Sequence, residues 1–323
     1  MIEEVAPELY RLEIPLPGSH LKWVNSYLVR GSRSLLIDTG WSHPRSQAEL
    51  ASGLNELGID PARTDLFITH LHSDHSGQAG SFVSSSVYFN RVEADEVNAI
   101  GAERERQFRA MGELFARHGF PRDDLGAVAN AHLGSRYGLQ KPVDFRLLGE
   151  GDTVNVGGYK FTCLETPGHS PGHLCLYEPA KRLLIAGDHL LAETPDVDVV
   201  YSMSCPDQLG RYLRSLDRVL GLDVALVLPG HGPIFANHRE RISELKRHHE
   251  ARLEELVKGL AGGPRSLRQL IAGLRWHQGP WEALPPLLRF FAFGEVLAHL
   301  ENLEGWGRVV RKTMGDGFVF EAR

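Results

Sequence analysis

The segment Thr69–Gly77, which reads Thr-His-Leu-His-Ser-Asp-His-Ser-Gly, most constrains the fold of this chain. It directly follows a short apolar run that predicts a buried strand. Alternate side chains of an extended chain point the same way, so His70 and His72 can reach one metal ion. Asp74 and His75 follow where the chain turns towards a helix, and they can face a second ion. Four ligand-type residues within six positions therefore predict a metal centre at the end of a strand.

Three more ligand-type residues occupy the same kind of position later in the chain. His169, Asp188 and His231 each lie just beyond a predicted strand, and each is close to a glycine that lets the backbone turn sharply. Loops at the ends of strands in a rigid sheet are the usual places for catalytic and binding residues. This recurrence argues against chance surface histidines and predicts one site to which all seven side chains contribute.

Composition and charge exclude several classes of protein. A length of 323 residues suits about two domains. The hydrophobic share of 42% and the charged share of 24% are ordinary for a soluble globular chain. A net charge of −6 gives no general attraction to nucleic acid or to an anionic membrane. Three cysteines, an acidic N-terminus and the lack of a long apolar run predict a cytoplasmic protein without a disulfide framework.

The hydrophobic pattern predicts a catalytic domain over residues 1–262. Its expected strands lie at 10–14, 23–30, 34–38, 66–69, 144–148, 159–165, 173–177, 182–186 and 224–228. Its expected helices lie at 43–57, 207–220 and 237–260, and the last is expected to carry His248 and His249 at the surface. Residues 91–140 lose the strand pattern and predict a helical insertion, either a lid over the site or a solvated excursion. The breaker Gly262-Gly263-Pro264 marks the domain boundary.

Residues 263–323 are expected to form a separate small domain. Two helices, near 266–274 and 286–303, precede short strands at 307–311 and 318–321, an order that predicts a winged helix. This unit has eight basic residues against six acidic ones, and its second helix opposes Arg289 with Glu295 and Glu301. A helix that enters a DNA groove should be basic. Packing on the catalytic domain or formation of a homodimer is therefore favoured over binding to nucleic acid.

These motifs, taken in order, resemble those of the metallo-β-lactamase superfamily over about residues 5–260. The resemblance implies an α+β fold, a four-layer αββα sandwich with metals at one edge of its two sheets. It implies one ion held by His70, His72 and His169, a second held by Asp74, His75 and His231, and Asp188 as the bridge between them. It also implies that Asp38, in Ile37-Asp38-Thr39-Gly40, orients ligands. The C-terminal unit resembles the winged helix of a glyoxalase II-like subgroup that includes thioester hydrolases and an RNA endonuclease.

The implied ligand set indicates the chemistry. Imidazoles and carboxylates without thiolate suit two divalent ions, Zn²⁺ first, with Fe or Mn as alternatives. Two ions about 3.5–4 Å apart can share a hydroxide that attacks near neutral pH. Asp74 and Asp188 are therefore the predicted catalytic residues. The predicted reaction is hydrolysis of a small carbonyl ester, foremost a thioester such as a hydroxyacylglutathione or an acyl-CoA. The helical insertion and the loop 192–202 are expected to shape its pocket.

Three alternatives stay open at this point. The first is an endonuclease for single-stranded RNA, which could use the same two ions. The second is a mononuclear iron persulfide dioxygenase, and the third is a regulator with a vestigial metal site. Flavodiiron oxidoreductases carry a glutamate at the position of His72, and true lactamases lack the bridging aspartate found here as Asp188. Both of these branches are therefore disfavoured.

Overall fold

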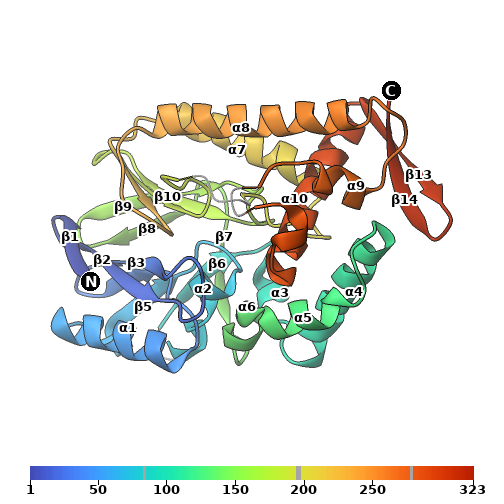
Figure 1. Ribbon diagram of the computed structural model, residues 1–323. Coiled ribbons are helices and arrows are strands. Elements are labelled where there is room, and N and C mark those ends of the chain that lie inside the picture. The colour runs from blue at the N-terminus through green and yellow to red at the C-terminus, as the bar shows by residue number, and fades with distance from the viewer. Residues whose placement is uncertain (83–84, 194–197, 277–278) are drawn as a thin grey trace.

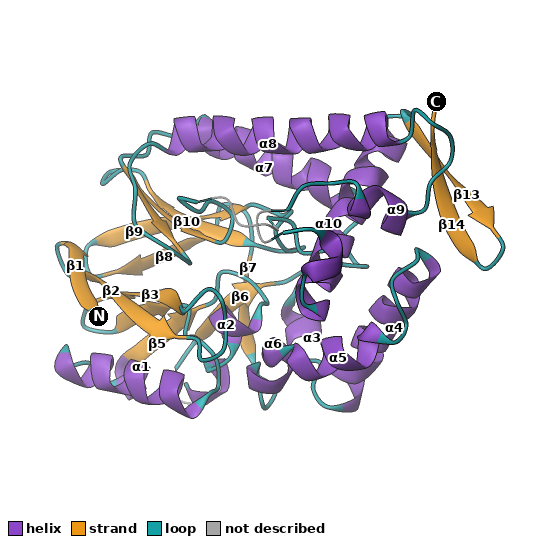
Figure 2. Cartoon of the chain, in the orientation of Figure 1, coloured by secondary structure: helices purple, strands orange, loops and turns teal. Residues whose placement is uncertain are grey.

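The computed structural model describes residues 1–82, 85–193, 198–276 and 279–323. Two β-sheets lie face to face at the centre, and helices cover the outer face of each (Figures 1 and 2). Helix α1 (Pro44–Glu56) lies on one outer side, and α7 (Gln208–Leu220) and α8 (His238–Gly259) lie on the other. The molecule therefore has the layers helix, sheet, sheet and helix.

Seven strands of the described chain form the first sheet. In spatial order they are β1 (Ile2–Ala6), β2 (Leu9–Pro15), β3 (Trp23–Val29), β4 (Ser34–Ile37), β5 (Thr64–Phe67), β6 (Val87–Asn90) and β7 (Phe145–Leu148). Strands β1 to β4 pair antiparallel, whereas β4, β5, β6 and β7 run parallel to one another. The segments that follow β4 and β5 therefore emerge at the same edge of this sheet.

The second sheet has five strands within the described residues. Its spatial order is β12 (Leu226–Pro229), β11 (Leu183–Gly187), β10 (Leu174–Glu178), β9 (Tyr159–Glu165) and β8 (Thr153–Val156). Strands β11 and β12 are parallel, and the other neighbours are antiparallel. Since β10 runs opposite to both β9 and β11, the strands β9, β11 and β12 all point the same way. Their carboxyl ends therefore lie at one edge.

Further helices lie between these strands. The connecting helices are η1 (Pro61–Arg63), α2 (Ser73–Ser76), η2 (Ala79–Ser81), α3 (Ala94–Val97), α4 (Ala102–Arg117), α5 (Asp124–Ala131) and α6 (Leu133–Tyr137). Four of them, α3 to α6, lie in residues 91–140, the segment that the sequence predicts to be a helical insertion. Helix α1 begins as predicted, with Pro44 in its first turn, and the His43 side chain accepts a hydrogen bond from the backbone N–H of Arg45. Among the described helices, none is both long and apolar enough to cross a membrane.

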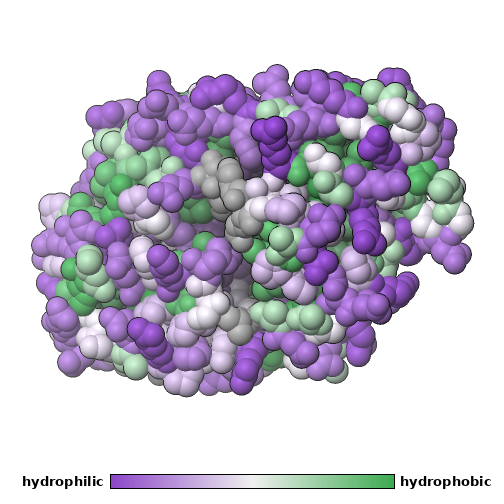
Figure 3. Space-filling model, viewed as in Figure 1, coloured by the Kyte–Doolittle hydropathy of each residue, from purple (hydrophilic) through white to green (hydrophobic). Residues whose placement is uncertain are grey.

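The central strands of both sheets are buried on both faces, which explains the continuous apolar runs in the sequence. In β4, Leu35 and Ile37 pack between the sheets, whereas Leu36 packs towards α1. In β11, Ile185 packs between the sheets and Leu184 packs beneath α7 and α8. Each of these fully buried side chains stabilises the fold by about 1.5–3 kcal/mol. Polar and charged side chains cover most of the face in Figure 3, with apolar side chains in separate groups.

The C-terminal elements share a core with the rest of the chain. They are α9 (Leu267–Ala272), η3 (Trp281–Ala283), α10 (Pro286–Gly305) and the hairpin β13 (Val309–Met314) and β14 (Gly317–Ala322). One buried cluster combines Phe293 of α10 and Phe320 of β14 with Leu184 of β11 and Leu253 of α8. Phe115 of α4 joins it, with its ring 4.7 Å from that of Phe290. The domain boundary near residue 262 stays a prediction.

Candidate metal centre

The topology explains why residues far apart in sequence meet at one place. The turn and short helix that carry His70 to His75 follow β5, and His169, Asp188 and His231 follow β9, β11 and β12. The loops that follow these strands of the two sheets converge, since His72 Nδ1 lies 3.0 Å from His169 Nε2 and His75 Nε2 lies 3.4 Å from Asp188 Oδ2. Residues 194–197, part of the loop expected to shape a pocket, lie outside the described residues.

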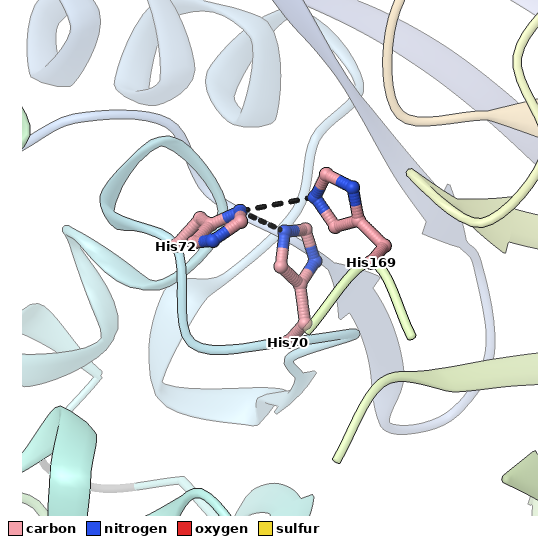
Figure 4. Close-up of side chains that lie close together, drawn as sticks. All are labelled: His70, His72 and His169. Carbon is pink, nitrogen blue, oxygen red and sulfur yellow. Dashed lines mark hydrogen bonds between the residues drawn. The ribbon is translucent and has the colours of Figure 1, made fainter. Parts of the chain in front are cut away.

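The first group of ligand atoms comes from three histidines. His72 Nδ1 lies 2.9 Å from His70 Nε2 and 3.0 Å from His169 Nε2. Figure 4 shows the three rings pointing towards one another, two from the segment after β5 and one from the loop after β9. Three imidazole nitrogens that converge on one point are a common set of protein ligands for zinc.

The second group contains Asp74, His75 and His231, and Asp188 connects it to the first. His231 Nε2 lies 3.2 Å from Asp74 Oδ2. The Asp188 Oδ2 atom lies 3.4 Å from His75 Nε2 and 3.5 Å from His231 Nε2. The same oxygen lies 3.6 Å from His169 Nε2, which belongs to the first group. All seven residues predicted as ligands are thus brought together.

Hydrogen bonds of the outer ring nitrogens leave the inner nitrogens free to bind metal. The Nδ1–H groups donate to Thr69 Oγ1 from His70 (3.0 Å), to Asp38 Oδ2 from His75 (2.7 Å), to the Asp198 carbonyl from His169 (2.9 Å) and to the Trp23 carbonyl from His231 (2.8 Å). Within the part of the chain that the structure describes, the inner atoms His75 Nε2, His231 Nε2 and Asp188 Oδ1 are buried and have no hydrogen-bond partner. Buried polar atoms need partners. These residues therefore fit divalent ions.

Asp38 has the orienting position that the resemblance implies. Its carboxylate accepts hydrogen bonds from the backbone N–H and the hydroxyl of Thr69, both at 2.8 Å, as well as from His75. The residue is buried and has a φ of 59°, in the left-handed region that aspartate tolerates better than most residues. Asp38 thereby holds the start of the histidine segment and one of its ligands at the same time.

Glu93 is a functional residue that the sequence pattern does not reveal. It is completely buried, and its two oxygens accept the backbone N–H groups of Leu71 at 2.6 Å and of Gly172 at 2.7 Å. One carboxylate thus ties the segment of His70 and His72 to the loop that contains His169. Burial raises the pKa of Glu93 to about 7. The only signal is its place three residues after β6, a strand too short to be predicted.

His173 and Gly230 position Asp188. The backbone N–H of Asp188 donates to His173 Nε2 at 3.2 Å, and His173 Nδ1 donates to Thr166 Oγ1 at 2.8 Å. A Cβ atom on Gly230 would lie 2.3 Å from Asp188 Oδ1, which is too close for two non-bonded atoms. The glycine after β12 is therefore required because the backbone passes directly beside this carboxylate.

The buried environment also selects the protonation state of the first group. Burial is the main cause that lowers the pKa of His72 to about 3, and it lowers the pKa of His70 and His169 as well. Neutral imidazole is the form that binds metal ions. The folded chain therefore presents this group ready for metal at neutral pH.

An open cavity of about 690 Å³ lies over α3 and the start of α4. Its lining includes three carboxylates, Asp95, Glu96 and Glu103, together with Ile100 and Ser204. No lysine or arginine is among its described lining residues. This cavity is therefore unsuited to a polyanion.

Comparisons with known proteins agree with this geometry. The sequence model of the family described as the Metallo-beta-lactamase superfamily matches residues 24–231. The Lactamase-like protein nscB of Neosartorya fischeri is 26% identical over 265 residues, which cover 81% of this chain but only 63% of that relative. The chain thus spans less than two thirds of the length of this fungal protein.

Two further proteins are similar over larger shares of their own length. The human Acyl-coenzyme A thioesterase MBLAC2 is 31% identical over 229 residues, which cover 67% of this chain and 75% of the human protein. The crystal structure of the metallo-beta-lactamase family protein TTHA1429 from Thermus thermophilus has a TM-score of 0.84 at 32% identity. That similarity covers 99% of this chain and 100% of the other, so it includes the C-terminal elements.

Proposed function

Because this chain belongs to the metallo-β-lactamase superfamily, we propose that it is a two-metal hydrolase whose substrate is a small thioester. The observation that carries the proposal is the position of Asp188 Oδ2. This oxygen lies within 3.6 Å of ligand nitrogens from both groups of the metal centre. A carboxylate in that place can be shared by two ions, as in two-metal hydrolases.

The roles of the residues follow from their positions. His70, His72 and His169 would hold one ion, Asp74, His75 and His231 the other, and Asp188 both. Zinc is the first choice for such a set of imidazoles and carboxylates. When bound, two such ions make coordinated water acidic enough to react near pH 7 and polarise the substrate's carbonyl group. Asp38, Glu93 and His173 keep the ligands in place through the hydrogen bonds described above.

One observation supports a thioester over the phosphodiester of RNA. The human relative at 31% identity is named as an acyl-coenzyme A thioesterase. A thiolate is also a good leaving group, so the reaction needs no strong general acid.

We also propose that residues 263–323 form a winged-helix unit that serves packing. The order α9, α10 and the hairpin β13–β14 supports this assignment. Twelve of the twenty residues of α10 are buried, so the helix that would enter a DNA groove lies within the protein. A homodimer formed through this unit stays a prediction, as does a cytoplasmic location.

The test is initial-rate hydrolysis of a panel of acyl-glutathione and acyl-CoA thioesters by zinc-loaded and manganese-loaded protein. Asp188→Asn should keep the fold and lower kcat/KM by about 100-fold or more. Removal of a residue that only orients a metal ligand already lowers metal affinity or activity by about 10–100-fold, and Asp188 is itself a predicted ligand. Asp144→Asn, at an exposed aspartate in the segment before β7, is the matched control and should leave kcat/KM unchanged.

Two outcomes would contradict the proposal. Normal turnover by Asp188→Asn would show that a bridged pair of ions is not required. An absence of thioester hydrolysis by the metal-loaded protein would reject the substrate class, and cleavage of single-stranded RNA by the same sample would then identify the nuclease alternative.

A further inference from the structure

A second cluster of imidazoles and carboxylates, distinct from the metal centre but next to it, lies between α8 and α10. It contains His248 and His249 of α8, Glu295 and His299 of α10, and Asp198. His249, Glu295, His299 and Asp198 are each at most 5% exposed. The ligand atoms of His248, His249 and Glu295 lie within 4.8 Å of one another, as do those in each group of the metal centre. The function proposed above uses none of these side chains.

Hydrogen bonds determine which nitrogen of each ring carries a proton. His299 Nδ1 lies 2.8 Å from the backbone carbonyl of Glu295, which only accepts, so this nitrogen is the donor. His299 is completely buried, and burial disfavours the charged form of the ring. Its Nε2 is therefore an acceptor, and it accepts a hydrogen bond from His249 Nδ1 at 3.1 Å. His249 Nε2 is consequently left with a free lone pair.

That lone pair faces the carboxylate of Asp198. His249 Nε2 and Asp198 Oδ2 are 3.6 Å apart, and within the described chain neither atom has a hydrogen-bond partner. Two buried acceptors facing each other are unfavourable unless something positive lies between them. The distance is longer than a direct hydrogen bond allows. It is close to the ~3.4 Å edge of a tetrahedral site with metal–ligand bonds of about 2.0–2.1 Å.

We propose that this cluster binds a divalent cation, with zinc as the first choice. His249 Nε2 and Asp198 Oδ2 would be two of its ligands, and His248 and Glu295, whose ligand atoms lie beside His249, would complete the set. Two imidazoles and two carboxylates suit zinc, and sites of this kind form between facing helices of a bundle core. His299 would orient His249 in the way that outer partners orient metal-binding histidines. Burial raises the pKa of Asp198 to about 7, and the positive charge of Arg241 opposes this rise. The Arg241 side chain is itself bonded to the Leu191 carbonyl and to Glu244.

The same aspartate connects this cluster to the metal centre. The carbonyl of Asp198 accepts the Nδ1–H of His169 at 2.9 Å, and its N–H donates to Glu295 Oε2 at 3.1 Å. An ion bound to the Asp198 side chain would therefore restrict the movement of Asp198, the residue whose carbonyl orients His169. The cluster would be a structural site that connects α8 and α10 to the metal centre.

The test counts zinc per chain by plasma mass spectrometry after zinc loading and gel filtration. His249→Gln and the near-isosteric Asp198→Asn should each hold one zinc fewer than the wild type. His238→Gln, at another buried histidine of α8, is the matched control and should hold as much zinc as the wild type. Circular dichroism of each sample confirms that the variants are folded.

A second sample separates this site from the metal centre. The double variant His72→Ala/His75→Ala removes a ligand from each group, yet it should retain one zinc that raises its Tm. Equal zinc contents in the wild type and folded His249→Gln or Asp198→Asn would overturn the proposal, because a proton or a water molecule would then separate the pair. If neither variant folds, an absence of zinc from the double variant would overturn it as well.

Discussion

At the scale of single residues, the two ring nitrogens of four histidines have different roles: one is bonded within the protein, and the other faces the metal centre. In His70, His75, His169 and His231 the Nδ1 atom binds an acceptor in the protein. The acceptors include the hydroxyl of Thr69, the carboxylate of Asp38 and two backbone carbonyls. The Nε2 atom of each ring is thereby fixed as the metal-binding atom, and each ring is also fixed in orientation.

Glu93 offers a direct test of how far such support extends. Glu93→Gln keeps the size of the side chain, but its amide nitrogen cannot accept the N–H that one carboxylate oxygen now accepts. We expect the affinity for zinc to fall by about 10–100-fold, measured by competition with a chelator. Glu96→Gln, in helix α3, which begins directly after Glu93, is the control. Equal affinities of the two variants would show that Glu93 does not position the ligands.

Gly230 tests the close approach beside Asp188. In Gly230→Ala the new methyl group would meet Asp188 Oδ1 at 2.3 Å and His75 Cε1 at 2.8 Å, so both ligands must move. We expect the loss of at least one zinc per chain, whereas Gly262→Ala, with nothing closer than 3.7 Å, should bind zinc normally. Full zinc content in Gly230→Ala would show that the loop can relax without harm to the centre.

At the scale of elements, the hydrophobic pattern predicts the long helices and most strands. Helices α1, α7 and α8 are confirmed within one residue because each has one apolar face on a sheet and an evident start or stop. Strands β1, β6 and β8 were not predicted. The latter two have only four residues each, too few for a period of two to stand out. His249 illustrates a different failure: it was expected at the surface of α8, but the C-terminal helix covers it.

The contact between α4 and the C-terminal hairpin predicts a pH dependence. His118, at the end of α4, packs against the rings of Phe318 and Phe320 with centroids 4.7 and 5.7 Å away. Burial lowers the pKa of His118 to about 4, below the value of about 6.5 expected in the unfolded chain. The folded state therefore binds fewer protons, and the stability from this contact is present above about pH 6.5 and lost towards pH 4.

The measurement is the Tm as a function of pH for the wild type and for His118→Gln, which cannot be protonated in this range. We expect the Tm of the wild type to fall more steeply between pH 6.5 and 4 than that of the variant. Parallel curves would mean that His118 is not among the groups that make the fold sensitive to acid.

At the scale of the whole molecule, the C-terminal elements are part of one buried cluster with the second sheet and its helices. Helix α10 packs against α5, α7, α8 and α9, and its residues Phe290 and Phe293 lie against the rings of Phe115 and Phe120. Each large side chain of this kind stabilises the fold by about 1.5–3 kcal/mol when buried. Several such losses exceed the ~5–15 kcal/mol that stabilises a typical protein.

Removal of residues 263–323 should therefore abolish cooperative thermal unfolding of the remainder, measured by calorimetry or circular dichroism. The full-length chain is the control. A truncated chain with a sharp transition near the Tm of the full-length protein would show that residues 1–262 fold independently. The boundary near residue 262 would then be a true domain boundary.

The candidate ligands could be selected from the sequence, since residue type and position after a strand are local properties that single-sequence patterns record. The two-sheet α+β architecture could be inferred because the motif order resembled a known family. The hydrogen bonds that hold these candidate ligands became visible only in the folded chain. Glu93, His173 and Asp198 act through hydrogen bonds to residues from 15 to 79 positions away, and no local pattern marks such partners. The packing of α10 against the second sheet and its helices could not be predicted either, because burial depends on which surfaces meet after the chain has folded.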